Sequence, residues 1–359
     1  MNRFRQQLAN LQNKKSLKPL SPAFRHIEFL VFGPGDVTAS APHIVDTLDS
    51  KRYMSMAVLA LMPLSLASVY FYGWRAVAMI LVSYIFAGIT ELLFAFFRKK
   101  EITEGFFVTG LIFPLILPPT IPLWIVAVGT VVGVFFGKEV FGGTGRNIFN
   151  PAIVGRVFVT IAFPLLMTTL WQLPFTEGLG GFLNFSRPDA ITSATPLGIF
   201  SGGEAALYSY SDLLLGRAPG SMGETFRLLI ILAGVFLIIV KISNWRIPVA
   251  YLGSVAVFSQ FGSMFYPGRV APPLFQLLTG GLLFAAFFMA TDPVTSPFTK
   301  QGKWIFGLML GMFTVLIRGF AGAVEGVMFS IILMNALTPV IDSLVLKFKF
   351  KPIKDYGVV

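Results

Sequence analysis

The sequence contains no cysteine and only two histidines, His26 and His43, among its 359 residues. The lack of cysteine excludes thiolate-bound iron–sulfur clusters, c-type haem and disulfide bonds within the chain. Both histidines precede the first long apolar segment, which also excludes a bis-histidine haem inside a membrane. If the chain carries electrons, the carrier must therefore be organic, or bound by groups other than Cys and His.

Charged residues are scarce too, at 13% of the sequence, whereas hydrophobic residues make up 55% and the mean hydropathy is +0.76. Apolar runs of about 20 residues have the length needed to cross a bilayer. The net charge of +11 does not indicate nucleic-acid binding, because the basic residues lie between apolar segments rather than on one stripe. The first 25 residues are basic and lack an apolar core, so we expect no signal peptide there.

Hydropathy therefore predicts an all-α polytopic membrane protein with about ten transmembrane helices. The third and fourth predicted helices are short and are separated by Pro118, Pro119 and Pro122, which must interrupt a helix. A break at membrane depth requires protein or a polar cavity around the freed backbone groups, so it indicates a built site. The predicted segments are 53–73, 76–97, 105–120, 121–137, 150–170, 226–242, 247–266, 274–291, 304–321 and 325–346.

The basic residues predict the orientation. With a cytoplasmic N-terminus, 21 Lys and Arg residues fall on the cytoplasmic side and 6 on the outside, so both ends are expected to be cytoplasmic. The predicted organisation is a cytoplasmic segment, a five-helix unit, an external loop rich in Gly, Ser, Pro and Thr, a second five-helix unit and a cytoplasmic tail. These parts cover residues 1–52, 53–170, 171–225, 226–346 and 347–359.

The two predicted units share a weak pattern. A proline-studded apolar run ends at Trp124 and another at Trp304, and each is followed by a Gly-rich segment and an Asn–Pro pair. Two units of five helices must be inverted relative to each other, an arrangement that is common among transporters. A flavin-free channel or solute transporter is therefore one hypothesis, and it predicts no bound flavin. A purely structural scaffold is another, although acidic residues within the apolar segments count against it.

The predicted external loop contains a polar stretch that runs from Asp189 through Thr192, Ser193 and Ala194 to Thr195. By itself the stretch is typical of a helix cap or turn. It resembles the flavinylation motif of the sodium-pumping NADH:quinone oxidoreductase and RNF families, with serine at position 193 where glycine is usual. The resemblance implies a covalent FMN whose phosphate is joined to the Thr195 hydroxyl. An external loop would expose this threonine to a modifying enzyme.

Ser221 and Glu224 follow in a Gly-rich stretch just before the sixth predicted helix. Backbone N–H groups at a helix N-terminus could hold the phosphate or an edge of the flavin. The spacing of Ser221 and Glu224 equally fits a capping box. Both interpretations remain open from the sequence.

A second motif runs from Lys138 to Pro151 as KEVFGGTGRNIFNP. It resembles the NqrB subunits of sodium-pumping NADH:quinone oxidoreductases, whereas the related RnfD subunits typically differ at Thr144, Arg146 and Arg156. The resemblance implies a non-covalent riboflavin in the membrane at Asn147 and Asn150, whose amides offer both donors and acceptors. Asn150 before Pro151 is also a good cap for the fifth helix, and the two roles can coexist.

The similarity extends from about residue 35 to the C-terminus and includes residues 104–109, 287–294 and 302–304. It implies ten helices in two inverted units, within a six-subunit redox complex of the bacterial inner membrane. Among acidic residues inside predicted helices, which are costly and usually functional, we expect Glu91 and Asp292 on the ion pathway. The family's quinone region maps to Ala87, Gly88 and Glu91. The alternative for Glu91 is a structural hydrogen bond, or a pair with Arg156.

The sequence thus predicts a subunit of a Na+-pumping NADH:ubiquinone oxidoreductase. Electrons would pass from a partner flavoprotein to FMN on Thr195, then to riboflavin near Asn147 and Asn150, and then to ubiquinone near Glu91, while Na+ moves outward. The chain shows no dinucleotide-binding fold, so another subunit would oxidise NADH. The nearest alternative is the RnfD subunit of an RNF ferredoxin:NAD+ oxidoreductase, which would carry FMN but donate to no quinone.

Overall fold

The computed structural model describes residues 50–99, 105–176, 194–201, 208–321 and 325–350. Within these ranges the regular structure is helical, without a β-strand. The flavinylation-motif residues Asp189, Thr192 and Ser193 lie outside them, as do most of the predicted N-terminal segment and tail.

Six helices are long and apolar enough to cross a membrane, and three apolar helices are shorter. The long helices expose large apolar side chains such as Leu66, Phe97 and Phe265, which suits a protein whose solvent is lipid. The prediction of an all-α polytopic membrane protein is confirmed. The long helices are α3 (Ser50–Tyr72), α4 (Trp74–Arg98), α6 (Leu123–Gly137), α12 (Arg246–Phe265), α15 (Lys300–Phe320) and α16 (Val327–Lys349), and the shorter ones are α5 (Gly105–Leu115), α7 (Pro151–Ala162) and α11 (Arg227–Ile239).

The predicted break after the third helix is confirmed. Helix α5 ends at Leu115, and α6 begins at Leu123, beyond the prolines. Arg75, at the start of α4, donates hydrogen bonds to the carbonyl oxygens of Pro119 at 3.0 Å and of Thr120 and Ile121 at 2.9 Å. These bonds satisfy backbone groups that lipid cannot.

The eighth predicted segment, 274–291, is also broken, which hydropathy did not predict. It consists of α13 (Pro273–Leu278), α14 (Leu282–Phe284) and a π-helical turn, η4 (Ala285–Met289). The interruption falls at Gly280, whose φ of +63° lies in the left-handed region that favours glycine. Arg318 of α15 donates to the carbonyl oxygens of Gln276 and Thr279, each at 3.0 Å. An arginine therefore covers freed carbonyls at both breaks.

A short 3-10 turn, η3 (Met222–Glu224), lies between the two broken segments. A Cβ added to Gly223 would lie 2.8 Å from the Cβ of Leu115 and 3.2 Å from Cε2 of Phe284. The hydroxyl of Ser68 in α3 donates to the carbonyl oxygen of Met222 at 2.9 Å. Residues 218–225, which the sequence assigned to the external loop, are thus buried among the helices.

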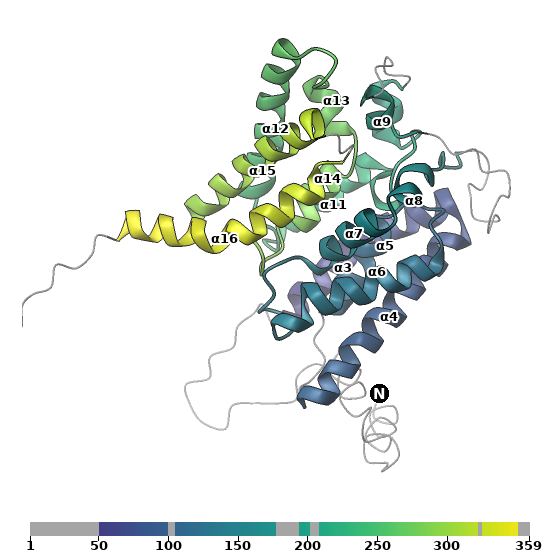
Figure 1. Ribbon diagram of the computed structural model, residues 1–359, viewed down its shortest axis with the longest axis vertical. Helices are drawn as coiled ribbons and strands as arrows, with labels where there is room; N and C mark the ends of the chain where they lie inside the picture. Colours follow the sequence, from purple (N-terminus) through teal and green to yellow (C-terminus); the bar gives the residue numbers. More distant parts are fainter. Residues whose placement is uncertain (1–49, 100–104, 177–193, 202–207, 322–324, 351–359) are drawn as a thin grey trace, which may run out of the picture.

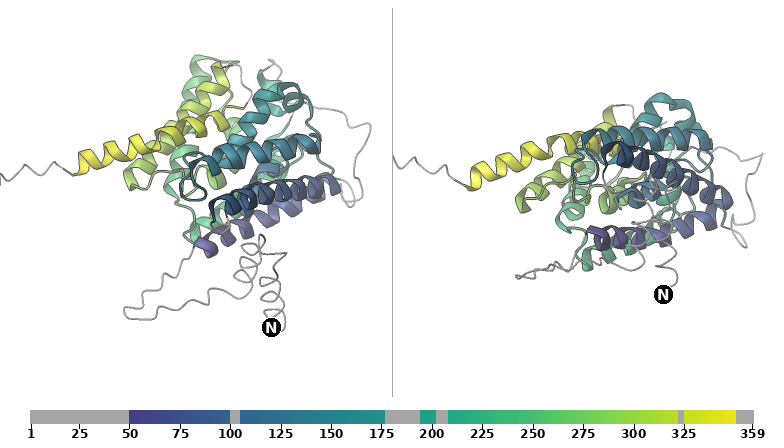
Figure 2. Two further views of the ribbon diagram at one scale, coloured as in Figure 1. Left: turned by 60° about the horizontal axis from the view of Figure 1, so that its bottom comes forward. Right: turned by 90° about the horizontal axis from the view of Figure 1, so that it is seen from below.

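Figure 1 shows α12, α15 and α16 gathered on one side of the molecule and α4, α6 and α7 on the other, with α11 and α14 between them. The views in Figure 2 preserve this division. The inverted relationship between two units and the sidedness of the termini stay predictions. At η3, the end of α5 at Leu115 and the α14 residue Phe284 come close together.

Glycines allow close helix packing on both sides. In α6, a Cβ on Gly133 would lie 2.6 Å from the carbonyl oxygen of Pro151 in α7. In α15, a Cβ on Gly311 would lie 2.8 Å from the backbone nitrogen of Val255 in α12 and would collide with Ser254. Small residues at such contacts are a general feature of membrane helix pairs.

We expect Gly311→Ala to destabilise the protein by about 1–3 kcal/mol, because the added methyl group overpacks the α12–α15 contact. The matched control is Gly253→Ala in α12, where an added Cβ would meet no atom within 4 Å. Thermal unfolding in detergent measures both. A Gly311→Ala variant as stable as Gly253→Ala would show that this contact tolerates a side chain.

Candidate functional site

The 138–151 motif and the 287–294 stretch meet at a cavity next to α3, α5, α11 and the end of η4. Asn147 and Asn150 line it together with Phe287, Phe288 and Asp292, although about 140 residues separate the two groups in the chain. Residues from the 104–109 stretch also contribute. Further lining residues are Tyr53, Gly105, Val108, Thr109, Ile112, Lys138, Thr144, Leu237, Ile242, Ser243, Thr291 and Val294.

The side chain of Asn150 forms two hydrogen bonds. Its Oδ1 accepts a hydrogen bond from the backbone nitrogen of Ala152 at 3.1 Å, so it caps α7 ahead of Pro151, as the sequence predicted. Its Nδ2 donates to Oδ2 of Asp292 at 3.5 Å. The cap therefore ties the start of α7 to the end of the eighth segment.

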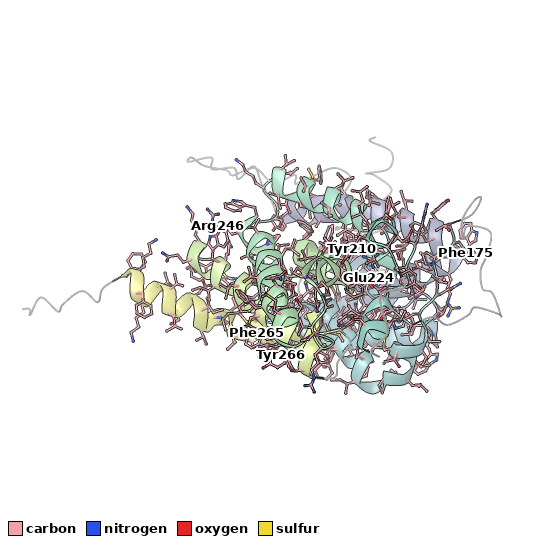
Figure 3. All side chains as sticks on the ribbon, turned by 90° about the horizontal axis from the view of Figure 1, so that it is seen from above. Phe175, Tyr210, Glu224, Arg246, Phe265 and Tyr266 are labelled. Atoms are coloured by element: carbon pink, nitrogen blue, oxygen red, sulfur yellow. The ribbon has the colours of Figure 1, made fainter. Side chains whose placement is uncertain are left out.

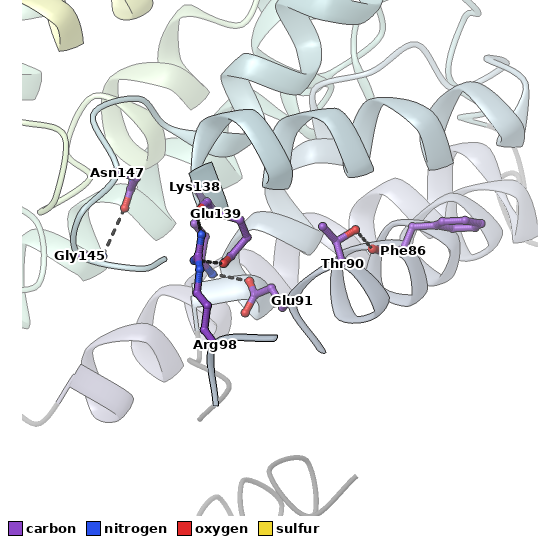
Figure 4. Close-up of polar contacts among 8 residues, drawn as sticks. All are labelled: Phe86, Thr90, Glu91, Arg98, Lys138, Glu139, Gly145 and Asn147. Carbon is purple, nitrogen blue, oxygen red and sulfur yellow. Dashed lines mark hydrogen bonds and ion pairs between the residues drawn. The ribbon is translucent and has the colours of Figure 1, made fainter. Parts of the chain in front are cut away.

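Asn147 stabilises the Gly-rich turn that precedes α7. Its Oδ1 accepts from the backbone nitrogen of Gly145 at 3.3 Å (Figure 4). Its Nδ2 donates to the carbonyl oxygen of Phe149 at 3.0 Å. An amide side chain has two donor hydrogens and two acceptor lone pairs. These two bonds therefore leave part of its hydrogen-bonding capacity available at the cavity.

Asp292 is held by local donors. Its Oδ1 accepts from the backbone nitrogen of Val294 at 3.2 Å, and its Oδ2 accepts from the hydroxyl of Thr295 at 3.2 Å. Elsewhere in the lining, the buried hydroxyl of Ser243 has no hydrogen-bond partner within the described part of the chain. A buried polar group without a partner is costly, so this hydroxyl fits a ligand with polar edges.

Glu91 forms an ion pair with Lys138, and both side chains are almost completely buried, at 4% and 3% exposed. The neighbouring pair is Arg98 Nη1 with Glu139 Oε2, at 3.0 Å (Figure 4). The suggested pairing of Glu91 with Arg156 is wrong. Helix α4 packs against α6, and Lys138 directly follows α6, so it lies within reach of Glu91. Arg156 on α7 instead pairs with Glu325, just before α16.

The predicted quinone stretch lies on the same part of α4. Ala87 is fully buried, and a Cβ on Gly88 would lie 4.0 Å from Cε2 of Phe106 at the start of α5. Lys138 both pairs with Glu91 and lines the cavity. This lysine links the quinone stretch to the cavity that contains the two asparagines.

Thr195 caps the short helix α9 (Pro196–Ser201). Its Oγ1 accepts a hydrogen bond from the backbone nitrogen of Gly198 at 3.2 Å, and the preceding Ala194 is exposed. Ser221 and Glu224 form the predicted capping box, in which the backbone nitrogen of Ser221 donates to Oε1 of Glu224 at 2.9 Å. Ser221 is 1% exposed, so its hydroxyl does not face a ligand at the surface.

The model of the NQR2, RnfD, RnfE family matches residues 37–351. The chain belongs to this family. The NqrB subunit of the sodium-translocating NADH-quinone reductase of Klebsiella pneumoniae is 33% identical over 405 residues, with 95% of each chain covered, and that of Pseudomonas aeruginosa is 34% identical over 384 residues, with 92% of each covered. The RnfD subunit of the proton-translocating ferredoxin:NAD+ oxidoreductase complex of Clostridium ljungdahlii is 39% identical over 329 residues, covering 87% of this chain and 95% of that one.

Membership of the NQR2, RnfD, RnfE family confirms the resemblance found in the sequence. Together with the long apolar helices, it identifies the chain as a multi-pass protein of the bacterial inner membrane. The roles assigned to individual residues stay predictions at this point.

Thr195 does not line the cavity. Helix α9 lies near one end of the molecule, and the C-terminal end of α4, beside the Gly-rich turn, lies near the other (Figure 1). The two candidate sites, at Thr195 and at the cavity, therefore lie apart from each other.

Sequence reasoning missed Lys138 and Ser243 as site residues. Lys138 could have been noticed because it directly follows one apolar helix, while another apolar helix contains a glutamate, Glu91, that needs a counter-ion. No sequence signal distinguishes Ser243 from other serines near helix ends.

Proposed function

We propose that this chain is the NqrB-type membrane subunit of a Na+-translocating NADH:ubiquinone oxidoreductase. In this proposal it carries FMN covalently on Thr195 and riboflavin at the cavity, and it passes electrons to ubiquinone while Na+ is exported. The observation that carries the proposal is the convergence of Asn147, Asn150 and the Phe287–Asp292 stretch on one cavity.

The residues of the cavity fit a flavin ring. The amides of Asn147 and Asn150 and the hydroxyl of Ser243 supply donors and acceptors for the polar edge of the ring. Phe287 and Phe288 supply apolar surface for its faces. A riboflavin bound there would provide one-electron chemistry, and the chain's residues would orient it and exclude water.

The Thr195 site fits a covalent flavin through its hydroxyl. Thr195 is partly exposed and stands just before a short helix, next to the exposed Ala194, which suits a hydroxyl that a modifying enzyme would have to reach. A phosphodiester formed there still contains oxygen atoms that can accept the capping hydrogen bond from Gly198.

Ubiquinone would be reduced near Ala87, Gly88 and Glu91. The buried ammonium of Lys138 could donate a hydrogen bond to a quinone carbonyl if its pairing with Glu91 loosened. Glu91 and Asp292 are the carboxylates proposed for the ion pathway, since Na+ is a hard cation that prefers oxygen ligands. The partners would be the other subunits of a six-subunit complex, one of which oxidises NADH.

A second candidate is the RnfD-type subunit of a ferredoxin:NAD+ oxidoreductase. The RnfD relative is 39% identical over 329 residues, whereas the alignment with the Klebsiella NqrB relative spans 405 positions for a chain of 359 residues and so contains long gaps. The assay that separates the candidates is electron transfer by the purified complex. Reduction of ubiquinone by NADH supports the NqrB type, and ferredoxin-dependent reduction of NAD+ without quinone reduction supports the RnfD type.

We expect Asn150→Leu to lower the riboflavin content of the purified chain about tenfold, because one lost hydrogen bond in a buried site costs about 1–3 kcal/mol. Acid extraction releases non-covalent riboflavin and leaves covalent FMN on the protein, so chromatography of the extract measures the change.

The matched control is Asn244→Leu. Asn244 accepts a hydrogen bond from the backbone nitrogen of Arg246 at 3.1 Å, the same local bond that Asn150 makes, but it does not line the cavity. Equal riboflavin in the two variants and the wild type would place the non-covalent flavin elsewhere.

A further inference from the structure

Five charged side chains, four of them buried and Glu325 15% exposed, form a cluster outside the cavity. They are Arg156 of α7, Arg227 at the start of α11, Arg318 of α15, Glu224 of η3 and Glu325 just before α16. Figure 3 places Glu224 in the interior, between the N-terminal helices and the C-terminal ones. The sequence predicted no such cluster, and the proposed electron path does not use it.

The cluster is only partly paired. Arg156 forms an ion pair with Glu325. Arg318 donates to Oε1 of Gln276 at 2.8 Å and to two backbone carbonyl oxygens at the helix break. Arg227 donates to the carbonyl oxygen of Leu213, and Glu224 accepts through Oε1 alone.

The cluster contains more hydrogen-bond donors and more positive charge than its acceptors and carboxylates balance. The Nε atoms of Arg156, Arg227 and Arg318 and the Oε2 of Glu224 are buried without a hydrogen-bond partner in the described ranges. Three guanidinium groups face two carboxylates, which leaves one net positive charge. Burial, followed by the nearby carboxylate of Glu325, raises the pKa of Glu224, and protonation of Glu224 would make the cluster more positive. Uncompensated buried charge is costly, so an anionic counterpart is expected.

The Arg318 edge of the cluster lies close to α9, the short helix that Thr195 caps. A Cβ on Gly280 would lie 2.6 Å from Nη2 of Arg318 and 2.8 Å from Cδ1 of Leu197, two residues beyond Thr195. At the adjacent Gly281, a Cβ would lie 3.1 Å from Oε2 of Glu224 and 3.9 Å from Nη1 of Arg156. Arg318 and Leu197 therefore approach the same side of Gly280, so the guanidinium group lies close to helix α9.

Helix α9 is fixed in this position by a second contact. The ring of Phe200 packs against Phe275 of α13, with the ring centroids 5.7 Å apart. Together the two contacts place α9, which Thr195 caps, beside the break that Arg318 covers.

We propose that this cluster is the electrostatic counterpart of the flavin on Thr195, and that its net positive charge favours placing an electron on that flavin. The inference rests on the proposed function, which supplies the covalent flavin. The electron comes from the reduced partner flavoprotein, which is oxidised as the flavin is reduced. No bond of this chain forms or breaks, and the cluster residues donate no proton. In a low-dielectric interior, one unit of charge has a large effect on such a step.

The test changes the charge of the cluster in both directions with substitutions of nearly equal size. Glu325→Gln removes a negative charge and is expected to raise the midpoint potential of the covalent flavin. Gln276→Glu adds a negative charge beside Arg318 and is expected to lower it. Each shift should be at least tenfold in the equilibrium constant for one-electron reduction, about 59 mV. The double variant should return close to the wild-type value.

The measurement is a spectroelectrochemical titration of the purified full-length chain, with the signal assigned by difference from Thr195→Val. Flavin fluorescence of the denatured chain is recorded first. A wild-type chain without it would refute the proposed function, while fluorescent variants with unshifted potentials, or with shifts of the same sign, would overturn the inference alone. Opposite shifts that cancel in the double variant would support it, because a general packing defect has no reason to reverse sign with charge.

Discussion

Replacing Thr195 with valine is expected to abolish the flavin fluorescence of the denatured chain under ultraviolet light. Valine has nearly the same shape as threonine but no hydroxyl, so a phosphodiester to FMN cannot form. The loss should be complete rather than partial. The effect on the fold should be small, about 1 kcal/mol, because the hydroxyl otherwise only caps the short helix α9.

Two controls make this result specific. Thr195→Ser keeps a hydroxyl at the same position and should retain fluorescence. Thr168→Val removes an exposed hydroxyl from another short helix, α8 (Pro164–Thr169), and should have no effect. Expression must take place in a host with an active flavin transferase. A dark wild-type band in that host would refute the covalent flavin and favour the flavin-free channel or transporter hypothesis.

Replacing Glu91 with glutamine is expected to destabilise the protein by about 3–5 kcal/mol, because Lys138 would remain buried without its counter-ion. The thermal midpoint should fall by about 10 °C. Thermal unfolding of the purified chain in detergent measures the change.

The double variant Glu91→Gln with Lys138→Met should recover most of that stability, since it removes both charges. Arg217→Gln is the control for a pair at the surface, because Arg217 and Asp212 lie 3.6 Å apart with side chains 60% and 34% exposed. This pair should contribute at most about 1 kcal/mol. If the double variant is as unstable as Glu91→Gln, the loss does not arise from the unpaired lysine.

Local chemistry let several features be predicted from the sequence. Long apolar runs require helices that cross a membrane, and Pro118 and Pro119 cannot continue a helix, so the break after α5 was predictable. The Asn150–Pro151 pair and the Ser221–Glu224 spacing predicted two helix caps that the structure contains. In each case the interacting groups are only a few residues apart.

Other features depend on how distant segments pack. The carbonyl groups freed by the break at Gly280 are covered by Arg318, which lies 38 positions later in the sequence. A hydropathy window averages over an apolar segment, so it could not predict that this segment is broken. Hydropathy likewise assigned residues 218–225 to a loop, because their burial depends on the two broken helices around them.

The sequence by itself determined the class of the protein, its family and the two stretches that carry the candidate flavin sites. Only the tertiary structure decided that Glu91 pairs with Lys138, that Asn150 meets Asp292, and that a cluster of arginines lies beneath the Thr195 helix. The physical reason is that an ion pair or a cavity wall is defined by which helix faces pack together. The spacing of residues along one helix leaves that choice open.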